Sequence, residues 1–338
     1  MAPWWLPGGH LQSIVPAFLM RRRPAVQYRR ERWDTRDGDF VRDGDFIDID
    51  FASPEPVATD APLLVLFHGL EGSSRGHYAR STMRFFADRG WRALVVHFRS
   101  CSGEMNRLPR AYHAGDYKEG DWILRAVHAR WPEARLYAVG VSLGGNMLAK
   151  WAGERGDSAS FVTAAASISA PLDLKAGGEK LRSGFNKIYT RHFLCTLRPK
   201  VEEKLRRFPD LARDSEHAKR MREAHDLYEF DNEYTAPVHG FHDVEDSSRD
   251  VEVYWERASA KPGLGMVRIP YLLLNALNDP FVPRESLPRV DQVSPLVELD
   301  QPAEGGHMGF PRGPWPGNID FVPERLHHFF SRHGSPQP

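Results

Sequence analysis

The 338-residue sequence has few cysteines, no net charge and no long apolar run. Its two cysteines, Cys101 and Cys195, are too few for a disulfide framework in a chain of this length, so we expect two free thiols in a reducing compartment. The 45 basic residues are balanced by 45 acidic ones, and this balance lacks the positive surface charge that binds nucleic acid. The composition therefore excludes a disulfide-stapled secreted domain and argues against a nucleic acid partner.

The apolar run near the N-terminus, residues 14–20, is too short to span a bilayer, which takes about 20 apolar residues. Three arginines, Arg21, Arg22 and Arg23, follow this run, whereas a signal peptide carries its positive charge before the apolar stretch. We therefore expect a cytoplasmic protein whose contact with membranes, if any, is peripheral.

Cofactor motifs are missing as well. The sequence has no phosphate-binding loop of the Walker type and no G-x-G-x-x-G motif after a predicted strand. Its 15 histidines include neither an H-E-x-x-H pair nor another spacing typical of metal ligands. We expect no nucleotide cofactor and no metal.

Strand-like and helix-like segments alternate from about residue 60 onward. Six apolar runs have the composition of strands buried on both faces of a sheet: residues 63–69, 93–99, 136–142, 164–170, 271–277 and 296–300. Helical segments lie between and after them, at residues 77–89, 116–130, 143–152 and 319–332. This alternation predicts an α/β fold whose mostly parallel sheet is covered by helices on both faces.

An antiparallel hairpin is predicted before this pattern, over residues 30–51. Asp37-Gly38 and Asp43-Gly44 are its candidate turns, because Asp-Gly pairs favour tight hairpin turns. With these two strands added, the expected sheet has about eight strands.

One interval, residues 173–262, is helical, rich in charged residues and histidine, and lacks a clear strand. We expect a single domain over residues 1–338, with a core of about 25–172 and 263–338 and this interval as a helical cap. Insertions at the carboxyl edge of such a sheet usually cover the site, although a solvated helical decoration is the alternative. In a lid, apolar side chains of this interval would face the site and form an acyl pocket: Phe185, Ile188, Tyr189, Phe193, Leu194, Tyr228, Phe230, Tyr254 and Trp255.

Ser142 stands where a predicted strand meets a predicted helix, in the sequence Gly140-Val141-Ser142-Leu143-Gly144. A sharp turn from strand to helix strains its central residue and leaves no room for bulky side chains two residues away. This spacing matches the G-x-S-x-G nucleophile elbow of the α/β-hydrolases, which presents a serine hydroxyl above the sheet. The alternative is a packing turn that happens to contain a serine.

A nucleophilic serine needs a histidine as its base and a carboxylate to orient that histidine, and in this fold the chain order is serine, acid, histidine. Asp279 lies just past the predicted strand 271–277, and Asp300, the alternative acid, ends the next one. His307 lies in a glycine-flanked loop after the last strand, from which an imidazole can reach the serine. The histidines of the insertion and of the C-terminal helix do not follow a strand end.

Two backbone N–H groups are candidates for an oxyanion hole. The N–H of Leu143 follows the serine directly and would face an oxyanion at the N-terminus of the helix. The second donor should come from the loop after the first central strand, where His68-Gly69-Leu70 offers the N–H of Leu70. We expect His68 to brace this loop.

Eight stretches of the sequence together carry a more specific similarity: PWWLPGGHLQSI (3–14), HGLEGSS (68–74), HFRSCSGEMNRLPRAYHAGD (97–116), GVSLGGNML (140–148), FDNEYTAPVHGF (230–241), VYWERAS (253–259), NDPFVP (278–283) and GGHMGF (305–310). On these stretches the chain resembles the YheT-like group of α/β-hydrolases, which includes eukaryotic abhydrolase-domain relatives acting on lipids. The resemblance covers nearly the whole chain. It implies a triad of Ser142, Asp279 and His307 and a carboxylic-ester hydrolase activity.

The sequence departs from the group in two places that do not touch the triad. It reads Arg99-Ser100-Cys101-Ser102-Gly103 where members usually read Arg-Gly-Cys-Ser-Gly. It also reads Tyr112-His113-Ala114-Gly115 where they usually read Tyr-His-Ser-Gly. We expect both changes to reshape the pocket wall.

We therefore expect a serine carboxylesterase or lipase that forms an acyl-enzyme on Ser142, with His307 as general base and acid and Asp279 orienting it. Its substrate would be a small acyl ester or a lipid. An acyltransferase or thioesterase with the same triad, and a non-catalytic module that holds an acyl ligand in the cleft, are the alternatives.

Overall fold

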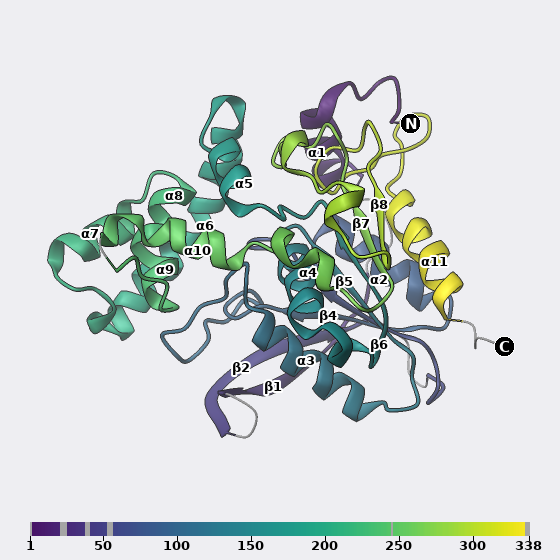
Figure 1. Ribbon diagram of the computed structural model, residues 1–338, viewed down its shortest axis with the longest axis horizontal. Coiled ribbons are helices and arrows are strands. Elements are labelled where there is room, and N and C mark those ends of the chain that lie inside the picture. The colour runs from purple at the N-terminus through teal and green to yellow at the C-terminus, as the bar shows by residue number, and fades with distance from the viewer. Residues whose placement is uncertain (1, 21–25, 38–40, 53–56, 245, 335–338) are drawn as a thin grey trace.

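Eight strands form the central sheet of the computed structural model, in the order β1-β2-β4-β3-β5-β6-β7-β8 (Figure 1). The structure describes residues 2–20, 26–37, 41–52, 57–244 and 246–334. The strands are β1 (Arg29–Asp37), β2 (Val41–Phe51), β3 (Leu63–Phe67), β4 (Arg92–His97), β5 (Leu136–Val141), β6 (Val162–Ile168), β7 (Tyr271–Leu274) and β8 (Val297–Asp300). Strands β3 to β8 pair with one another in parallel. Strand β2 is antiparallel to both of its neighbours, β1 and β4. The predicted α/β class, with a mostly parallel sheet of eight strands, is confirmed.

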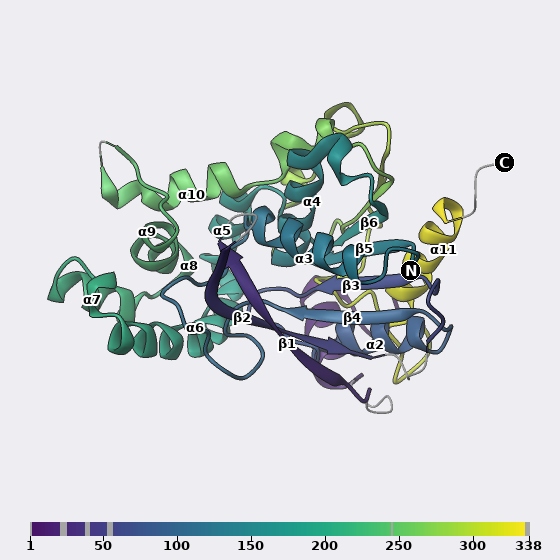
Figure 2. The ribbon, with the colours of Figure 1, turned by 90° about the horizontal axis from the view of Figure 1, so that it is seen from below.

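Helices cover both faces of this sheet, which is why its central strands are largely apolar and buried. The four covering helices are α2 (His77–Ala87), α3 (Tyr117–Arg130), α4 (Leu143–Arg155) and α11 (Phe321–His333). Side chains of α3 and α4 belong to the core on one face, and those of α2 and α11 to the core on the other. Figure 2 shows α3 and α4 on one side of the sheet and α2 on the other.

Asp37 and Val41 form the last pair of residues between β1 and β2. The candidate turn Asp37-Gly38 includes a residue outside the described ones, and the candidate turn Asp43-Gly44 is wrong. Asp43 and Gly44 lie inside β2 as part of a bulge, because pairing between the two strands continues on both sides of them. Gly44 has a φ of 83°, a left-handed conformation that serves the bulge.

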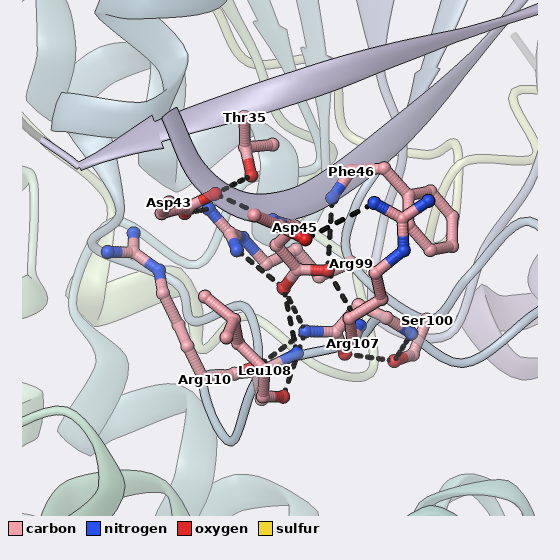
Figure 3. Close-up of polar contacts among 12 residues, drawn as sticks. Thr35, Asp43, Asp45, Phe46, Arg99, Ser100, Arg107, Leu108 and Arg110 are labelled. Carbon is pink, nitrogen blue, oxygen red and sulfur yellow. Dashed lines mark hydrogen bonds and ion pairs between the residues drawn. The ribbon is translucent and has the colours of Figure 1, made fainter. Parts of the chain in front are cut away.

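The bulge directs two aspartates toward Arg99, whose side chain is buried (Figure 3). One guanidinium nitrogen of Arg99 lies 2.7 Å from Asp45, and another lies 3.1 Å from Asp43 and 2.7 Å from Glu119. Burial by itself would raise the pKa of Asp45, but hydrogen bonds, first among them that from Asn106, and the charge of Arg99 hold it below its usual value. This network fixes the chain after β4 against the hairpin.

Between β6 and β7 the chain forms six α-helices and no strand among its described residues, and Figure 1 shows these helices together on one side of the sheet. They are α5 (Leu174–Leu181), α6 (Lys187–Arg207), α7 (Ser215–Glu223), α8 (Leu227–Phe230), α9 (Ala236–Val238) and α10 (Asp250–Ala258). A separate apolar cluster holds α6, α7 and α8 together. The interval that we predicted as a cap is therefore helical.

One further helix, α1 (Gly8–Phe18), precedes the sheet and contacts the loops after β7 and β8. Two glycines allow this close approach. A Cβ on Gly9 would lie 1.9 Å from the carbonyl oxygen of Asn278, and a Cβ on Gly309 would lie 1.8 Å from that of Gln12. Within the described residues, no helix combines the length and the apolar composition needed to cross a bilayer.

Candidate active site

Ser142 joins the end of β5 to the start of α4 with its backbone in the left-handed region, at a φ of 54°. Glycines permit this turn because other backbone segments come very close. A Cβ on Gly140 would lie 2.2 Å from the carbonyl oxygen of Gly144, and one on Gly144 would lie 2.5 Å from that of His68. A Cβ on Gly69 would lie 3.0 Å from the Cβ of Ser142, so the loop after β3 runs directly beside the serine.

The side chains of Ser142, His307 and Asp279 form one line of hydrogen bonds. Nε2 of His307 lies 3.0 Å from Oγ of Ser142, and its Nδ1 lies 2.8 Å from Oδ2 of Asp279. Both His307 and Asp279 are buried. The carboxylate is fixed from its other side, because Oδ1 accepts a hydrogen bond of 2.8 Å from the N–H of Phe281. With Nδ1–H donated to the carboxylate, Nε2 is left as the acceptor for the serine hydroxyl.

Asp300, the alternative acid, has a different partner. It ends β8 and forms an ion pair of 2.6 Å with Arg325 of α11. Among the described residues no hydrogen bond joins Asp300 to His307. The geometry therefore favours Asp279 as the partner of the histidine.

The loop after β3 is held by His68, which is buried. Its Nε2 accepts a hydrogen bond of 3.1 Å from the N–H of Phe98, so Nδ1–H donates to the carbonyl oxygen of Gly69 at 2.7 Å. Burial lowers the pKa of His68 to about 3, and the ring stays neutral at physiological pH. In the described part of the chain, the N–H groups of Leu70 and Leu143 donate no hydrogen bond within the protein. Both are therefore available to a ligand oxygen.

Glu71 connects this loop to helix α6. Its backbone is left-handed, with a φ of 54°. The hydroxyl of Tyr112 accepts a hydrogen bond of 2.9 Å from the N–H of Glu71 and donates one of 2.8 Å to its Oε1. Lys200 of α6 donates to the same oxygen at 2.7 Å. The helical insertion is thus in direct ionic contact with the residue that follows Leu70.

A largely apolar cavity of about 1150 Å³, its open mouth included, borders the serine and the histidine. The insertion contributes many of its walls, among them Leu174, Leu181, Phe193, Leu197, Phe230, Tyr254 and Trp255. Five residues that we expected in the pocket do not border it: Phe185, Ile188, Tyr189, Leu194 and Tyr228. Phe185 and Ile188 are instead 50% and 53% exposed, and Leu194 packs inside the insertion, so the prediction is wrong for these five. In the described residues, no cluster of three or more His, Cys, Asp or Glu side chains is suited to a metal ion.

The loop that carries His307 has an unusual backbone. Gly306, Met308 and Phe310 have φ values of 63°, 61° and 40°, in the left-handed region that side chains rarely adopt. Such a loop keeps its shape only if its surroundings determine it. The N–H of Met308 donates to Oγ of Ser169, at the end of β6, at 3.0 Å.

Helix α1 supplies further support for this loop. Oγ of Ser13 accepts a hydrogen bond of 2.7 Å from the N–H of His307, and Oε1 of Gln12 accepts one of 3.0 Å from the N–H of Gly305. Oδ1 of Asn278 accepts hydrogen bonds from the N–H of Gly305 at 3.0 Å and from the N–H of Gly306 at 2.9 Å. Sequence reasoning missed these roles. The N-terminal motif contained both α1 residues, but no local pattern connects them to a loop 294 positions away.

The fold and the arrangement at its carboxyl edge are those of the α/β-hydrolases. The alpha/beta hydrolase fold family matches residues 62–314 of this chain. The chain is 35% identical to the "putative esterase YheT" of Escherichia coli over 301 residues, which cover 89% of this chain and 84% of that protein. It is 30% identical to human "phospholipase ABHD3" over 319 residues, which cover 94% of this chain and 75% of that protein. The esterase Pf2001 of Pyrococcus furiosus, a solved structure, shares the fold with a TM-score of 0.53 at 15% identity, covering 92% of each chain.

The chain belongs to the YheT-like group of the α/β-hydrolase family. The similarity to YheT and to ABHD3 extends over most of the chain. Because the relatives bear the names of esterases and lipases, they support a hydrolase of this type.

We expect Ser13→Ala to lower kcat for a soluble ester by roughly 10- to 100-fold and to leave KM nearly unchanged. The substitution removes the acceptor for the N–H of His307, and small displacements of catalytic groups cost rates of this size. Ser331→Ala is the matched control. The hydroxyl of Ser13 donates to the carbonyl oxygen of Gly9, and that of Ser331 donates in the same way to the carbonyl oxygen of His327, but Ser331 lies exposed on α11. Equal rates for both variants would show that Ser13 does not position the histidine.

Proposed function

We propose that the protein is a serine hydrolase of carboxylic esters, with Ser142 as nucleophile, His307 as general base and acid, and Asp279 as the carboxylate that orients the histidine. The observation that carries the proposal is the line of hydrogen bonds from Asp279 through His307 to Ser142, with 2.8 Å and 3.0 Å between the bonded atoms. A module that only holds an acyl ligand has no need for a serine hydroxyl within reach of an oriented imidazole.

Acylation starts when Nε2 of His307 takes the hydroxyl proton of Ser142 as Oγ attacks the ester carbonyl carbon. The imidazolium that forms is stabilised by Asp279, whose carboxylate has already fixed the ring through Nδ1–H. The histidine then gives the proton to the leaving alcohol. Water repeats the sequence on the acyl-enzyme and releases the carboxylic acid.

The oxyanion of each tetrahedral intermediate would be held by the backbone N–H groups of Leu70 and Leu143. Both residues border the cavity at Ser142, and neither N–H is used inside the described part of the protein. Leu143 is the first residue of α4, so the helix dipole adds to its effect. Donors fixed in advance in this way stabilise the charge that develops in the transition state.

The helical interval between β6 and β7 would serve as a cap that forms the acyl-binding wall. Its Phe193 borders the cavity, and Leu197 lies one turn further along α6. Apolar walls of this kind bind the hydrocarbon part of an ester and give no preference to a charged acyl group. An uncharged acyl ester or lipid is therefore the proposed substrate, in keeping with the names of the relatives.

The assignment of the triad predicts a ranking among three variants. Ser142→Ala should lose on the order of 10⁴- to 10⁶-fold in ester turnover, and Asp279→Asn roughly 10⁴-fold, because the misoriented imidazole no longer acts as a base. Asp300→Asn, whose carboxylate pairs with Arg325, should stay within about tenfold of the parent. Turnover of a series of chromogenic esters, with circular dichroism as the check on folding, measures the ranking. If Ser142→Ala kept a few per cent or more of the turnover of the parent, another group would be the nucleophile.

The proposed acyl wall predicts a change in chain-length preference. Phe193→Ala should alter the ratio of kcat/KM for an octanoyl ester to that for an acetyl ester by roughly tenfold, because Phe193 borders the cavity and we expect only the longer chain to contact it. Phe185→Ala, at an exposed position of the same interval, is the control and should leave the ratio unchanged. If Phe193→Ala lowers kcat/KM for both esters in equal proportion, the residue supports the structure of the cap and does not bind substrate.

A further inference from the structure

Helix α1 has its polar side chains inside and its apolar side chains outside. Its sequence, GGHLQSIVPAF, contains no acidic or basic residue other than one histidine. Gln12 and Ser13 are buried because they hold the His307 loop. Leu11 and Phe18, seven residues apart and so on one face of the helix, are 43% and 61% exposed. A surface helix that faces water carries its polar residues on the outside, so this outer face is suited to another environment.

The outer face continues over neighbouring segments. We call the whole surface the N-terminal apolar patch: Trp4, Leu11, Phe18, Leu19, Phe185, Ile188 and Trp315. These are seven of the eleven large apolar side chains that are exposed among the described residues, so the exposure is concentrated and not scattered. The segments touch one another through rings, with centroids 4.6 Å apart for His10 and Phe185 and 5.1 Å apart for Trp5 and Trp315.

A set of contacts connects the patch to the cavity. Nδ1 of His10 lies 3.0 Å from the hydroxyl of Tyr189, whose ring centroid is 4.6 Å from that of Phe281. Phe281 borders the cavity, and its ring centroid lies 4.1 Å from that of His307. A continuous set of aromatic contacts therefore leads from α1 to the histidine. Figure 1 shows α1 and α5 at the same edge of the molecule, at the top of the view.

The surroundings of the patch favour an anionic lipid surface over a protein partner. Lys187 and Arg191 are exposed on either side of Ile188 in α6. Lys180 is exposed as well and lies close enough to His10 for its charge to lower the pKa of that ring, second to burial. Trp4 and Trp315 are 92% and 68% exposed, and tryptophan is the residue that favours the boundary between lipid headgroups and hydrocarbon.

We propose that the N-terminal apolar patch docks on the surface of an anionic lipid bilayer and so brings the neighbouring cavity close to the membrane. Leu11, Phe18 and the two tryptophans would enter the interface, and the flanking cations would lie among the headgroups. The proposal rests on the proposed function in one respect, since the bilayer would be the source of the ester. The same helix would then contact the membrane with its outer face and the catalytic loop with its inner face.

Cosedimentation with vesicles tests the docking. The probes are vesicles of phosphatidylcholine alone and of phosphatidylcholine mixed with phosphatidylglycerol, and Ser142→Ala is the parent so that no lipid is hydrolysed. We expect binding to the mixed vesicles, weaker binding to the neutral ones, and a loss of about tenfold or more in affinity for Trp4→Glu combined with Leu11→Glu. Met266→Glu combined with Val290→Glu is the matched control, since these side chains are 56% and 81% exposed elsewhere, and it should bind like the parent.

Activity gives a second readout in the enzyme with its serine intact. Trp4→Glu combined with Leu11→Glu should leave turnover of a soluble acetyl ester within about twofold and should lower turnover of an ester dissolved in mixed vesicles by about tenfold. If the double variant does not fold, as judged by circular dichroism, Trp315→Glu takes its place.

Three results would overturn the docking: no binding of the parent to either vesicle, equal binding of the patch variant and the control, or a parent dimer that becomes monomeric in the patch variant without any vesicle binding. The last result would assign the patch to a second copy of the chain. Vesicle binding does not depend on the identity of the nucleophile. Persistent activity of Ser142→Ala would therefore remove the proposed function and leave the docking result unaffected.

Discussion

The site depends on the left-handed backbone of Ser142, held between a buried strand and a helix. Around this turn, main chain lies closer to Gly140 and Gly144 than a Cβ allows, and Gly69 lies against the Cβ of Ser142. The same crowding brings the loop after β3 against the serine, where Leu70 and Leu143 border the cavity. A Cβ at Gly140 or Gly144 would have to displace main chain, and one at Gly69 would crowd the Cβ of Ser142, so one constraint shapes both the turn at Ser142 and the loop beside it.

The remaining groups come from the carboxyl ends of other strands and are fixed by segments outside the sheet. Asp279 follows β7 and His307 follows β8, and the strained loop of the histidine is held by α1, by Asn278 and by Ser169. Lys200 of the helical insertion contacts Glu71, beside the proposed oxyanion donor. The histidine thus depends on the N-terminal helix, and the loop of Leu70 on the insertion, although both segments lie outside the sheet that positions the serine.

Much of this arrangement could be predicted from the sequence, because it follows from patterns within short stretches of the chain. The central strands are continuous apolar runs, and the turn at Ser142 needs glycines at a fixed spacing, so the sheet and the triad candidates follow from short stretches. What could not be predicted depends on distant contacts. Asp43-Gly44 has the composition of a turn, yet the pairing of β1 with β2 on both sides makes it a bulge. Phe185 is as apolar as Phe193, and only the packing of α6 and of the turn before it decides that the first is exposed and the second borders the cavity.

Labelling with a fluorophosphonate tests the central claim, that Ser142 is a nucleophile activated by His307, most directly. Such a reagent forms a bond from the attacking oxygen to phosphorus and releases fluoride, so mass mapping of the peptides identifies the oxygen that attacked. The account predicts one phosphonyl group per chain, on Ser142, and a labelling rate that falls by about 10³-fold or more in His307→Ala. A label on another residue, or a rate on Ser142 that does not depend on His307, would contradict it.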